Sequence, residues 1–236
     1  MHMLRRTSYS VLPVLVLAAG CTSPGTQIVR DLPEPLVQRP GQLLRPQSAP
    51  QPKPLAKAAP KKSDGKQSWF PPGGFSKRWK YIVVHHSADE RSTPEGMAAW
   101  HRQRGWDELG YHFVIGNGVN TRDGAITPGT RWPKQKHGAH TRISSTDDNR
   151  WNEHGIGICL IGNFEKRGPT PKQIESLTEL LAFLTKHCRL SESSIYTHGG
   201  VDPHTKCPGR NFSLHAIKQR LARARMAGEQ IHASAR

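Results

Sequence analysis

The sequence predicts an α/β domain with a central mixed β-sheet flanked by helices, preceded by a long disordered segment. Between residues 76 and 226, short apolar runs rich in β-branched side chains alternate with longer runs of helical periodicity. Such alternation is typical of helices packed on a mostly parallel sheet. Before residue 76, proline is frequent and the apolar residues follow no period, so no packed core is expected there.

The first half of the domain contains three predicted strands and one predicted helix. The runs at 79–86, 111–118 and 155–162 are short and apolar, as expected of buried strands. After the first run, Thr93 directly precedes Pro94. Threonine is a common N-cap residue and proline is favoured at the first helical position, so a helix is expected to begin here.

The second half contains the clearest helix, at 170–188. Thr170 and Gln173 have the spacing of a capping box, and the apolar residues that follow recur on one helical face. A short strand at 194–198 and a basic helix at 213–225 complete the expected domain. Residues 227–236 are expected to form a flexible tail.

The N-terminal segment predicts export. Residues 1–20 combine two early arginines with an apolar run that is too short to span a bilayer, followed by small residues. The stretch LAAGC, which ends at Cys21, resembles a bacterial lipobox, in which the cysteine is lipidated and becomes the new N-terminus. We therefore expect a lipoprotein on the periplasmic side of a bacterial membrane, more specifically the outer membrane. The alternative is ordinary secretory cleavage, with Cys21 incidental.

Residues 21–75 are expected to form a proline-rich basic linker. Eleven of the 19 prolines lie between residues 22 and 75, and proline together with like charges keeps such a chain extended. A tether of this kind would let an anchored domain explore a layer outside its membrane. The folded domain is expected to span residues 76–226.

The formal net charge of +16 predicts an anionic partner. Nucleic acid is disfavoured, because the basic clusters are not interleaved with stacking aromatic residues and because an export signal is present. The four cysteines are too few and too scattered for a disulfide framework. An acidic lipid or a cell-wall polymer remains, and the protein itself is expected to be a monomer.

Histidine, cysteine and tyrosine recur at predicted strand ends and in loops, in the stretches VVHHSA, GYHFVI, YTHGG and DPHTKCPG. A catalytic zinc ion needs three protein ligands and an open position for water. Residues 85, 198 and 207 could supply such ligands from three distant segments. Spacing alone does not single them out, since 13 histidines offer many accidental triplets.

Three longer motifs occur in order along the domain: WHRQRGWDELGYHFVIGNG, HGAHTR followed by GIGICLIGNF, and HGGVDPHTKCPG. Together they resemble the zinc N-acetylmuramoyl-L-alanine amidases of phage lysozyme and peptidoglycan recognition proteins, over residues 79–222. The resemblance implies a mixed sheet with a zinc cleft at its strand ends. It also implies cleavage of the amide between the lactyl group of N-acetylmuramic acid and the L-alanine of the peptidoglycan stem peptide.

The same resemblance assigns roles residue by residue. It implies Zn²⁺ ligation by His85, His198 and Cys207. Tyr111 matches the family's catalytic tyrosine. Either Thr205 or its neighbour Lys206 assists catalysis. His140 is expected to lie in the substrate cleft.

The remaining histidines and cysteines have simpler interpretations. Successive strand residues face opposite ways, so if His85 faces the metal, His86 points away and is structural. His112 and His101 are likewise expected to be structural, and His204 is the main rival metal ligand. Cys159 and Cys188 are expected to be buried thiols. The alternative function is a non-catalytic peptidoglycan-binding module, which typically lacks the zinc cysteine.

Overall fold

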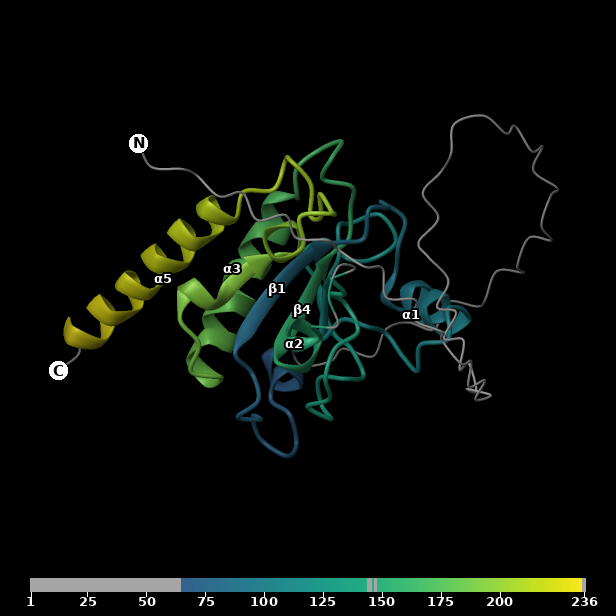
Figure 1. Cartoon of the computed structure of the whole chain (residues 1–236). Coiled ribbons are helices and arrows are strands. Elements are labelled where there is room, and N and C mark those ends of the chain that lie inside the picture. Colours follow the sequence, from purple (N-terminus) through teal and green to yellow (C-terminus); the bar gives the residue numbers. More distant parts are fainter. Residues whose placement is uncertain (1–64, 144–145, 147, 235–236) are drawn as a thin grey trace, which may run out of the picture. The chain divides into compact units, whose positions relative to one another are not determined.

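The computed structural model describes residues 65–143, 146 and 148–234, with side chains up to residue 227 (Figure 1). The predicted signal peptide, Cys21 and most of the predicted linker lie outside these residues. Within the described part, no helix is long and apolar enough to cross a membrane.

A five-stranded sheet forms the centre of the domain, in the order β3-β2-β4-β1-β5. Strands β1, β2, β4 and β5 run parallel and β3 is antiparallel to β2, which confirms the predicted mixed sheet. The strands are β1 (Tyr81–His86), β2 (Phe113–Ile115), β3 (Ile126–Pro128), β4 (Gly155–Leu160) and β5 (Ile195–Thr197).

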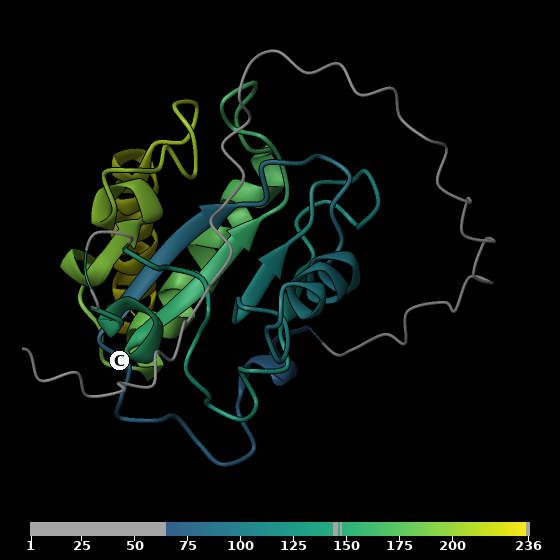
Figure 2. The ribbon, with the colours of Figure 1, turned by 45° about the vertical axis from the view of Figure 1, so that its right-hand side comes forward.

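One face of the sheet packs against α3 (Pro171–His187) and α5 (Leu214–Ser234), as Figure 2 shows. Alternate residues of β1 and β4, among them Ile82 and Ile158, meet the buried leucines of α3 in the main core. The predicted capping box of α3 is present, with the Thr170 side chain accepting from the Gln173 N–H. The predicted capping of that helix is therefore confirmed.

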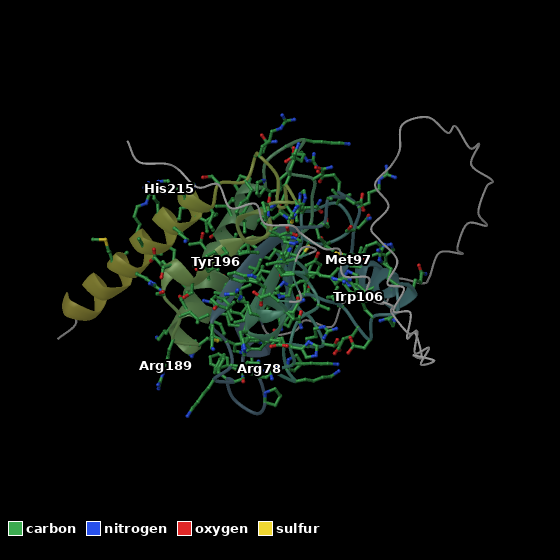
Figure 3. All side chains as sticks on the ribbon, viewed as in Figure 1. Arg78, Met97, Trp106, Arg189, Tyr196 and His215 are labelled. Atoms are coloured by element: carbon green, nitrogen blue, oxygen red, sulfur yellow. The ribbon has the colours of Figure 1, made fainter. Side chains whose placement is uncertain are left out.

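The opposite face carries α1 (Pro94–Gln103) and a smaller apolar cluster. Met97 of α1 packs there with Val114 and Cys159 of the sheet, and Figure 3 labels Met97 and Trp106 on this side. Thr93 caps α1 as predicted, since its side chain accepts from the Gly96 N–H. Two short helices adjoin strand ends: α2 (Arg150–Glu153) directly precedes β4, and α4 (His198–Val201) directly follows β5.

The domain begins earlier than the predicted boundary at residue 76. A 3₁₀ helix, η1, spans Gly65–Trp69, and Trp69 is buried in the main core, where its ring lies edge-on to Phe183 at 5.3 Å. The Trp69 carbonyl also accepts from Trp132 Nε1 at 2.8 Å. Because the sequence around Trp69 is rich in proline, this residue was expected to belong to the linker.

Four further elements differ from the predictions. Helix α5 continues to Ser234, so the expected flexible tail from residue 227 is helical for most of its length. Strand β3 and helix α2 were not predicted, because they have three and four residues respectively. Such short elements are too brief to show a periodic pattern. A second 3₁₀ helix, η2 (Glu192–Ser194), precedes β5.

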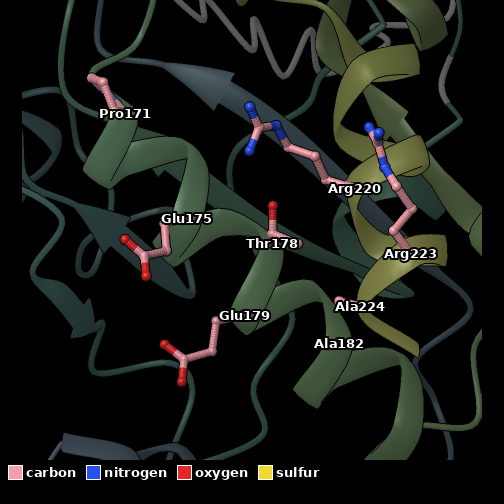
Figure 4. Close-up of a pocket in the computed structure, with 8 residues that line it drawn as sticks. All are labelled: Pro171, Glu175, Thr178, Glu179, Ala182, Arg220, Arg223 and Ala224. Atoms are coloured by element: carbon pink, nitrogen blue, oxygen red, sulfur yellow. The ribbon is translucent and has the colours of Figure 1, made fainter. Parts of the chain in front are cut away.

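A groove lies between α3 and α5, on the far side of the sheet from the smaller cluster (Figure 4). Glu175 and Glu179 of α3 face Arg220 and Arg223 of α5 across it. None of the predicted site residues is among the described residues that line this groove. This groove is therefore separate from the predicted site residues.

Candidate active site

The three predicted metal ligands come together at one edge of the sheet. His85 is the fifth residue of β1, and His198 begins α4 directly after β5. Because β1 and β5 are parallel neighbours, their carboxyl ends meet at the same edge. Cys207 reaches this edge from the following loop, where the Gly199 N–H donates to its carbonyl at 2.6 Å. One ligand atom of each residue lies within 4.8 Å of the others.

The donor atoms of this cluster fit a zinc ion. His198 Nε2 is buried and has no hydrogen-bond partner among the described residues, and such an orphaned nitrogen needs a ligand. His85 Nδ1 lies 3.9 Å from Cys207 Sγ, close to the separation of about 3.6 Å that tetrahedral zinc geometry implies for N and S ligands. Two imidazoles and a thiolate are a usual donor set for zinc.

The protonation of the cluster follows from its burial. Burial lowers the pKa of His85 and, less strongly, that of His198, so both rings are neutral and able to bind a metal. Burial also raises the pKa of the Cys207 thiol to about 12, an effect that the His86 N–H opposes by donating to Sγ at 3.4 Å. A metal would therefore displace the thiol proton on binding.

The second ring nitrogen of His85 faces another histidine. His85 Nε2 lies 3.1 Å from Nδ1 of His140. His140 itself is only 7% exposed, and its Nε2 lies 3.2 Å from the Gly155 carbonyl oxygen. The structure thus places His140 behind His85, a candidate metal ligand, with a polar partner for each of its ring nitrogens.

Tyr111 borders the cluster from the start of β2. Its ring centroid lies 5.3 Å from that of His85. Burial raises the pKa of the Tyr111 hydroxyl well above its usual value, and the neighbouring Cys159 and Cys207 sulfurs add to this. The hydroxyl therefore stays protonated and can donate a hydrogen bond.

The two candidates beside Cys207 differ in placement. Thr205 is half-buried and its Oγ1 accepts from the Cys207 N–H at 3.2 Å, so it shapes the loop that carries the thiol. Lys206 is exposed. The geometry brings Thr205, and not the Lys206 ammonium, into contact with a ligand residue.

The histidines expected to be structural have hydrogen-bond partners of their own. His86 points away from the cluster, and its Nδ1 accepts from the Phe164 N–H at 3.1 Å. His112 Nδ1 accepts from the Gly157 N–H at 2.9 Å, and His101 Nδ1 accepts from the Gly110 N–H at 3.0 Å. His204, the rival ligand, is exposed and lies 3.1 Å from Asp202.

Two buried polar residues that support the site were missed by the sequence analysis. Arg131 is 1% exposed and donates to the carbonyls of Leu109 and His137, which ties together the loops that carry Tyr111 and His140. Asn152 accepts from the backbone N–H of His140 at 2.7 Å. Their only signal in the sequence is position, close to GYHF and to GIGICL, and position alone does not reveal burial.

Comparisons with known proteins agree with this geometry. A family model described as N-acetylmuramoyl-L-alanine amidase matches residues 75–210. The endolysin of Enterobacteria phage T3 is 32% identical over 135 residues, which cover 54% of this chain and 78% of the endolysin. The peptidoglycan-recognition protein SC1a/b of Drosophila simulans is 28% identical over 158 residues, which cover 59% of this chain and 77% of that protein.

A solved structure extends the likeness to the fold. The N-acetylmuramoyl-L-alanine amidase LysC from Clostridium intestinale URNW superposes with a TM-score of 0.52 at 33% sequence identity, covering 62% of this chain and 89% of that one. The residues matched by the family model, 75–210, include His85, His198 and Cys207. By its sequence and its fold, the chain belongs to the N-acetylmuramoyl-L-alanine amidase family.

Proposed function

We propose that this protein is a zinc-dependent N-acetylmuramoyl-L-alanine amidase. It hydrolyses the amide between the lactyl group of N-acetylmuramic acid and the L-alanine of the stem peptide. The observation that carries the proposal is the convergence of His85, His198 and Cys207, together with the unpartnered, buried Nε2 of His198.

Each nearby residue has a part in this reaction. A bound zinc ion supplies an activated water and acts as a Lewis acid on the scissile carbonyl. The neutral imidazoles of His85 and His198 and the thiolate of Cys207 would hold the ion and would leave a net charge near +1 on the site. Tyr111, kept protonated by its burial, donates to the carbonyl oxygen as negative charge develops there. Thr205 holds the Cys207 loop in place through its hydroxyl.

The alternative is a peptidoglycan-binding module without catalysis, because peptidoglycan-recognition proteins are also among the relatives. The two functions differ in what the site requires. A binding module needs a groove for the polymer, whereas hydrolysis needs all three metal ligands and a donor for the oxyanion. The presence of Cys207 and Tyr111 beside the two histidines favours the enzyme.

Purified protein and cell-wall sacculi provide the test. The wild-type protein is expected to carry one zinc ion per chain and to release stem peptides with a free L-alanine amino group. Cys207→Ser should lose zinc and activity together. Cys188→Ser is the matched control, because Cys188 is a half-buried free cysteine that packs against the main core, and it should keep both. A zinc-loaded wild-type protein that binds sacculi without releasing peptides would favour the binding module.

The proposed cellular setting follows from residues outside the described part of the chain. We propose that the protein is exported and anchored by lipid on Cys21 to a bacterial membrane, with the outer membrane as the proposed site because Thr22, and not an aspartate, follows the cysteine. Several acyl chains hold a protein firmly at a bilayer, whereas one does so only marginally. Cys21→Ser should move the protein to the soluble fraction and leave its activity on isolated sacculi unchanged. Wild-type protein found soluble, without lipid on Cys21, would support simple secretion.

A further inference from the structure

We propose that His140 is a positioning residue for the metal site, which holds His85 in the tautomer that presents Nδ1 to the ion. The inference rests on the proposed zinc site and goes beyond it, because it assigns His140 a role toward the ligand His85 and not toward the substrate.

The protons of the pair can be assigned from their partners. His140 Nε2 lies 3.2 Å from the Gly155 carbonyl oxygen. A carbonyl only accepts, so this nitrogen carries a hydrogen. Both nitrogens of this buried ring face uncharged partners, and a neutral imidazole carries only one ring hydrogen. Its Nδ1 is then a bare acceptor.

This acceptor faces His85. Because His85 Nε2 and His140 Nδ1 are 3.1 Å apart, one of the two must carry a hydrogen, since two lone pairs would repel. The hydrogen therefore sits on His85 Nε2 and points at His140. The lone pair of the neutral His85 ring is then on Nδ1, the nitrogen that faces Cys207 Sγ at 3.9 Å. A hydrogen bond from the outer nitrogen of a ligating histidine fixes its tautomer and orientation in this way.

The Thr141 hydroxyl is the other group near these nitrogens. Thr141 Oγ1 lies 2.9 Å from His140 Nδ1 and 3.5 Å from His85 Nε2. Its hydroxyl can share the single lone pair of His140 Nδ1 with His85 Nε2–H, and the longer distance to His85 makes Thr141 the weaker acceptor for His85 Nε2–H. His140 is therefore the main partner of His85.

The packing around His140 shows that its ring position is built into the fold. A Cβ placed on Gly138 would lie 2.3 Å from His140 Cδ2, and one on Gly157 would lie 2.4 Å from the same atom. The ring thus occupies space that only glycine leaves free on both sides. Asn152 fixes the backbone as well, since its Oδ1 accepts from the N–H groups of His140 and Thr141 at 2.7 and 2.9 Å.

The same contacts argue against a direct role for His140 in binding substrate. Its ring is 7% exposed, and both nitrogens already have partners. A substrate group would have to displace either His85 or the Gly155 carbonyl in order to reach it. The ring therefore acts through His85.

Two substitutions separate the acceptor from the bulk of the ring. His140→Phe keeps the ring shape and removes the acceptor. His140→Asn is smaller, yet it places an amide oxygen about where Nδ1 stands. Loss of such an outer partner typically weakens metal binding by about 10–100-fold. We expect His140→Phe to raise the zinc dissociation constant by that factor, measured by competition with a chelator, and His140→Asn to recover part of the loss.

His112→Phe is the matched control. His112 is also a fully buried histidine with both nitrogens hydrogen-bonded, to the Gly157 N–H and to the Lys136 carbonyl oxygen. Its ring lies 5.8 Å from that of His140, but among the described residues it makes no hydrogen bond to His85, His198 or Cys207, so its loss should lower stability and leave zinc affinity unchanged. Equal losses of affinity in His112→Phe and His140→Phe would point to a general effect on folding and would overturn the assignment.

A measurement on the metal-free protein tests the tautomer directly. Nitrogen chemical shifts of the imidazole rings distinguish a hydrogen on Nδ1 from one on Nε2. We expect His85 to be in the Nε2–H form in the wild type and in Thr141→Val, and to become a mixture in His140→Phe. A His85 ring that stays wholly in the Nε2–H form in His140→Phe would refute the inference. Because this readout needs no zinc, it remains decisive even if the wild-type protein proves not to bind the metal, which would count against the proposed function alone.

Discussion

Acidification should destabilise the domain through His112, a neutral histidine that is completely buried. Its Nδ1 accepts from the Gly157 N–H and its Nε2 donates to the Lys136 carbonyl oxygen. Burial lowers the pKa of His112 to about 4; the Lys136 carbonyl opposes this, and the positive charge of Arg131 adds to it. A proton added to His112 Nδ1 would break the hydrogen bond that the Gly157 N–H, in the middle of β4, donates to this nitrogen.

The change in the free energy of unfolding follows from the pKa values of His112 in the folded and in the unfolded chain. An unfolded histidine has a pKa of about 6.5, so between pH 6.5 and pH 4 the unfolded chain binds more protons than the folded one. The contribution of His112 to stability is therefore complete above pH 6.5 and is lost as the pH falls. Linkage gives a loss of about 2 kcal/mol at pH 5 and about 3.4 kcal/mol once the pH is below 4.

Urea unfolding at pH 7.5 and pH 5 measures this loss, with His112→Asn as the reference that does not titrate. His101, whose burial also lowers its pKa to about 4, titrates in both proteins and cancels in the comparison. The free energy of unfolding should fall by about 2 kcal/mol more in the wild type than in His112→Asn. An identical pH dependence in the two proteins would show that His112 is protonated as easily in the folded state, and the argument from burial would fail.

Three further predictions test separate parts of the molecule. Tyr111→Phe should keep zinc and melting temperature and should lower turnover on sacculi about 10²–10³-fold, as expected for the loss of one oxyanion donor; an unchanged rate would remove Tyr111 from the mechanism. Thr205→Val should lower turnover because the Cys207 loop loses its hydroxyl contact, whereas Lys206→Ala should not; the reverse result would assign the assisting role to the lysine. Trp69→Ala should lower the free energy of unfolding, measured in urea, by about 3–5 kcal/mol. Phe70→Ala should lower it much less, because the Phe70 side chain is 44% exposed. Equally small losses in the two variants would support the predicted domain boundary at residue 76.

Regular local patterns explain which parts of the fold were predictable. The capping residues Thr93 and Thr170 satisfy the first N–H groups of α1 and α3 through contacts within four residues, so the sequence alone contains the signal. Trp69 has no such signal. Its burial depends on Phe183 and Trp132, which are more than 60 residues away, and a single aromatic residue beside prolines is typical of linkers as well.

The candidate site also has features that a local sequence pattern predicts and features that it does not. The separation of His85 from His86 was predictable because strand residues alternate between faces, and the structure confirms that His86 turns toward Phe164. The convergence of His85, His198 and Cys207 was predicted from family resemblance, since no local pattern joins three distant segments. The contacts of His140 depend on Gly138, Gly157 and Asn152 together, and so could not be read from any one stretch.

Strand β4 shows how one short sequence serves both the core and the site. Ile156, Ile158 and Leu160 belong to the main core beneath α3, while the alternate residues Gly155, Gly157 and Cys159 face the other way, in register with Tyr81, Val83 and His85 of β1. A glycine inside a strand normally costs about 0.5–1 kcal/mol relative to alanine, so a sheet built for stability alone would not place Gly157 here. Gly157→Ala would recover that entropy, but its Cβ would lie 2.4 Å from His140 Cδ2. The ring behind His85 would then have to move. Gly157 is therefore best explained as space kept for the histidine pair, at a small cost in the stability of the sheet, whereas a Cβ on Gly155 would meet the Trp151 carbonyl oxygen at 2.1 Å.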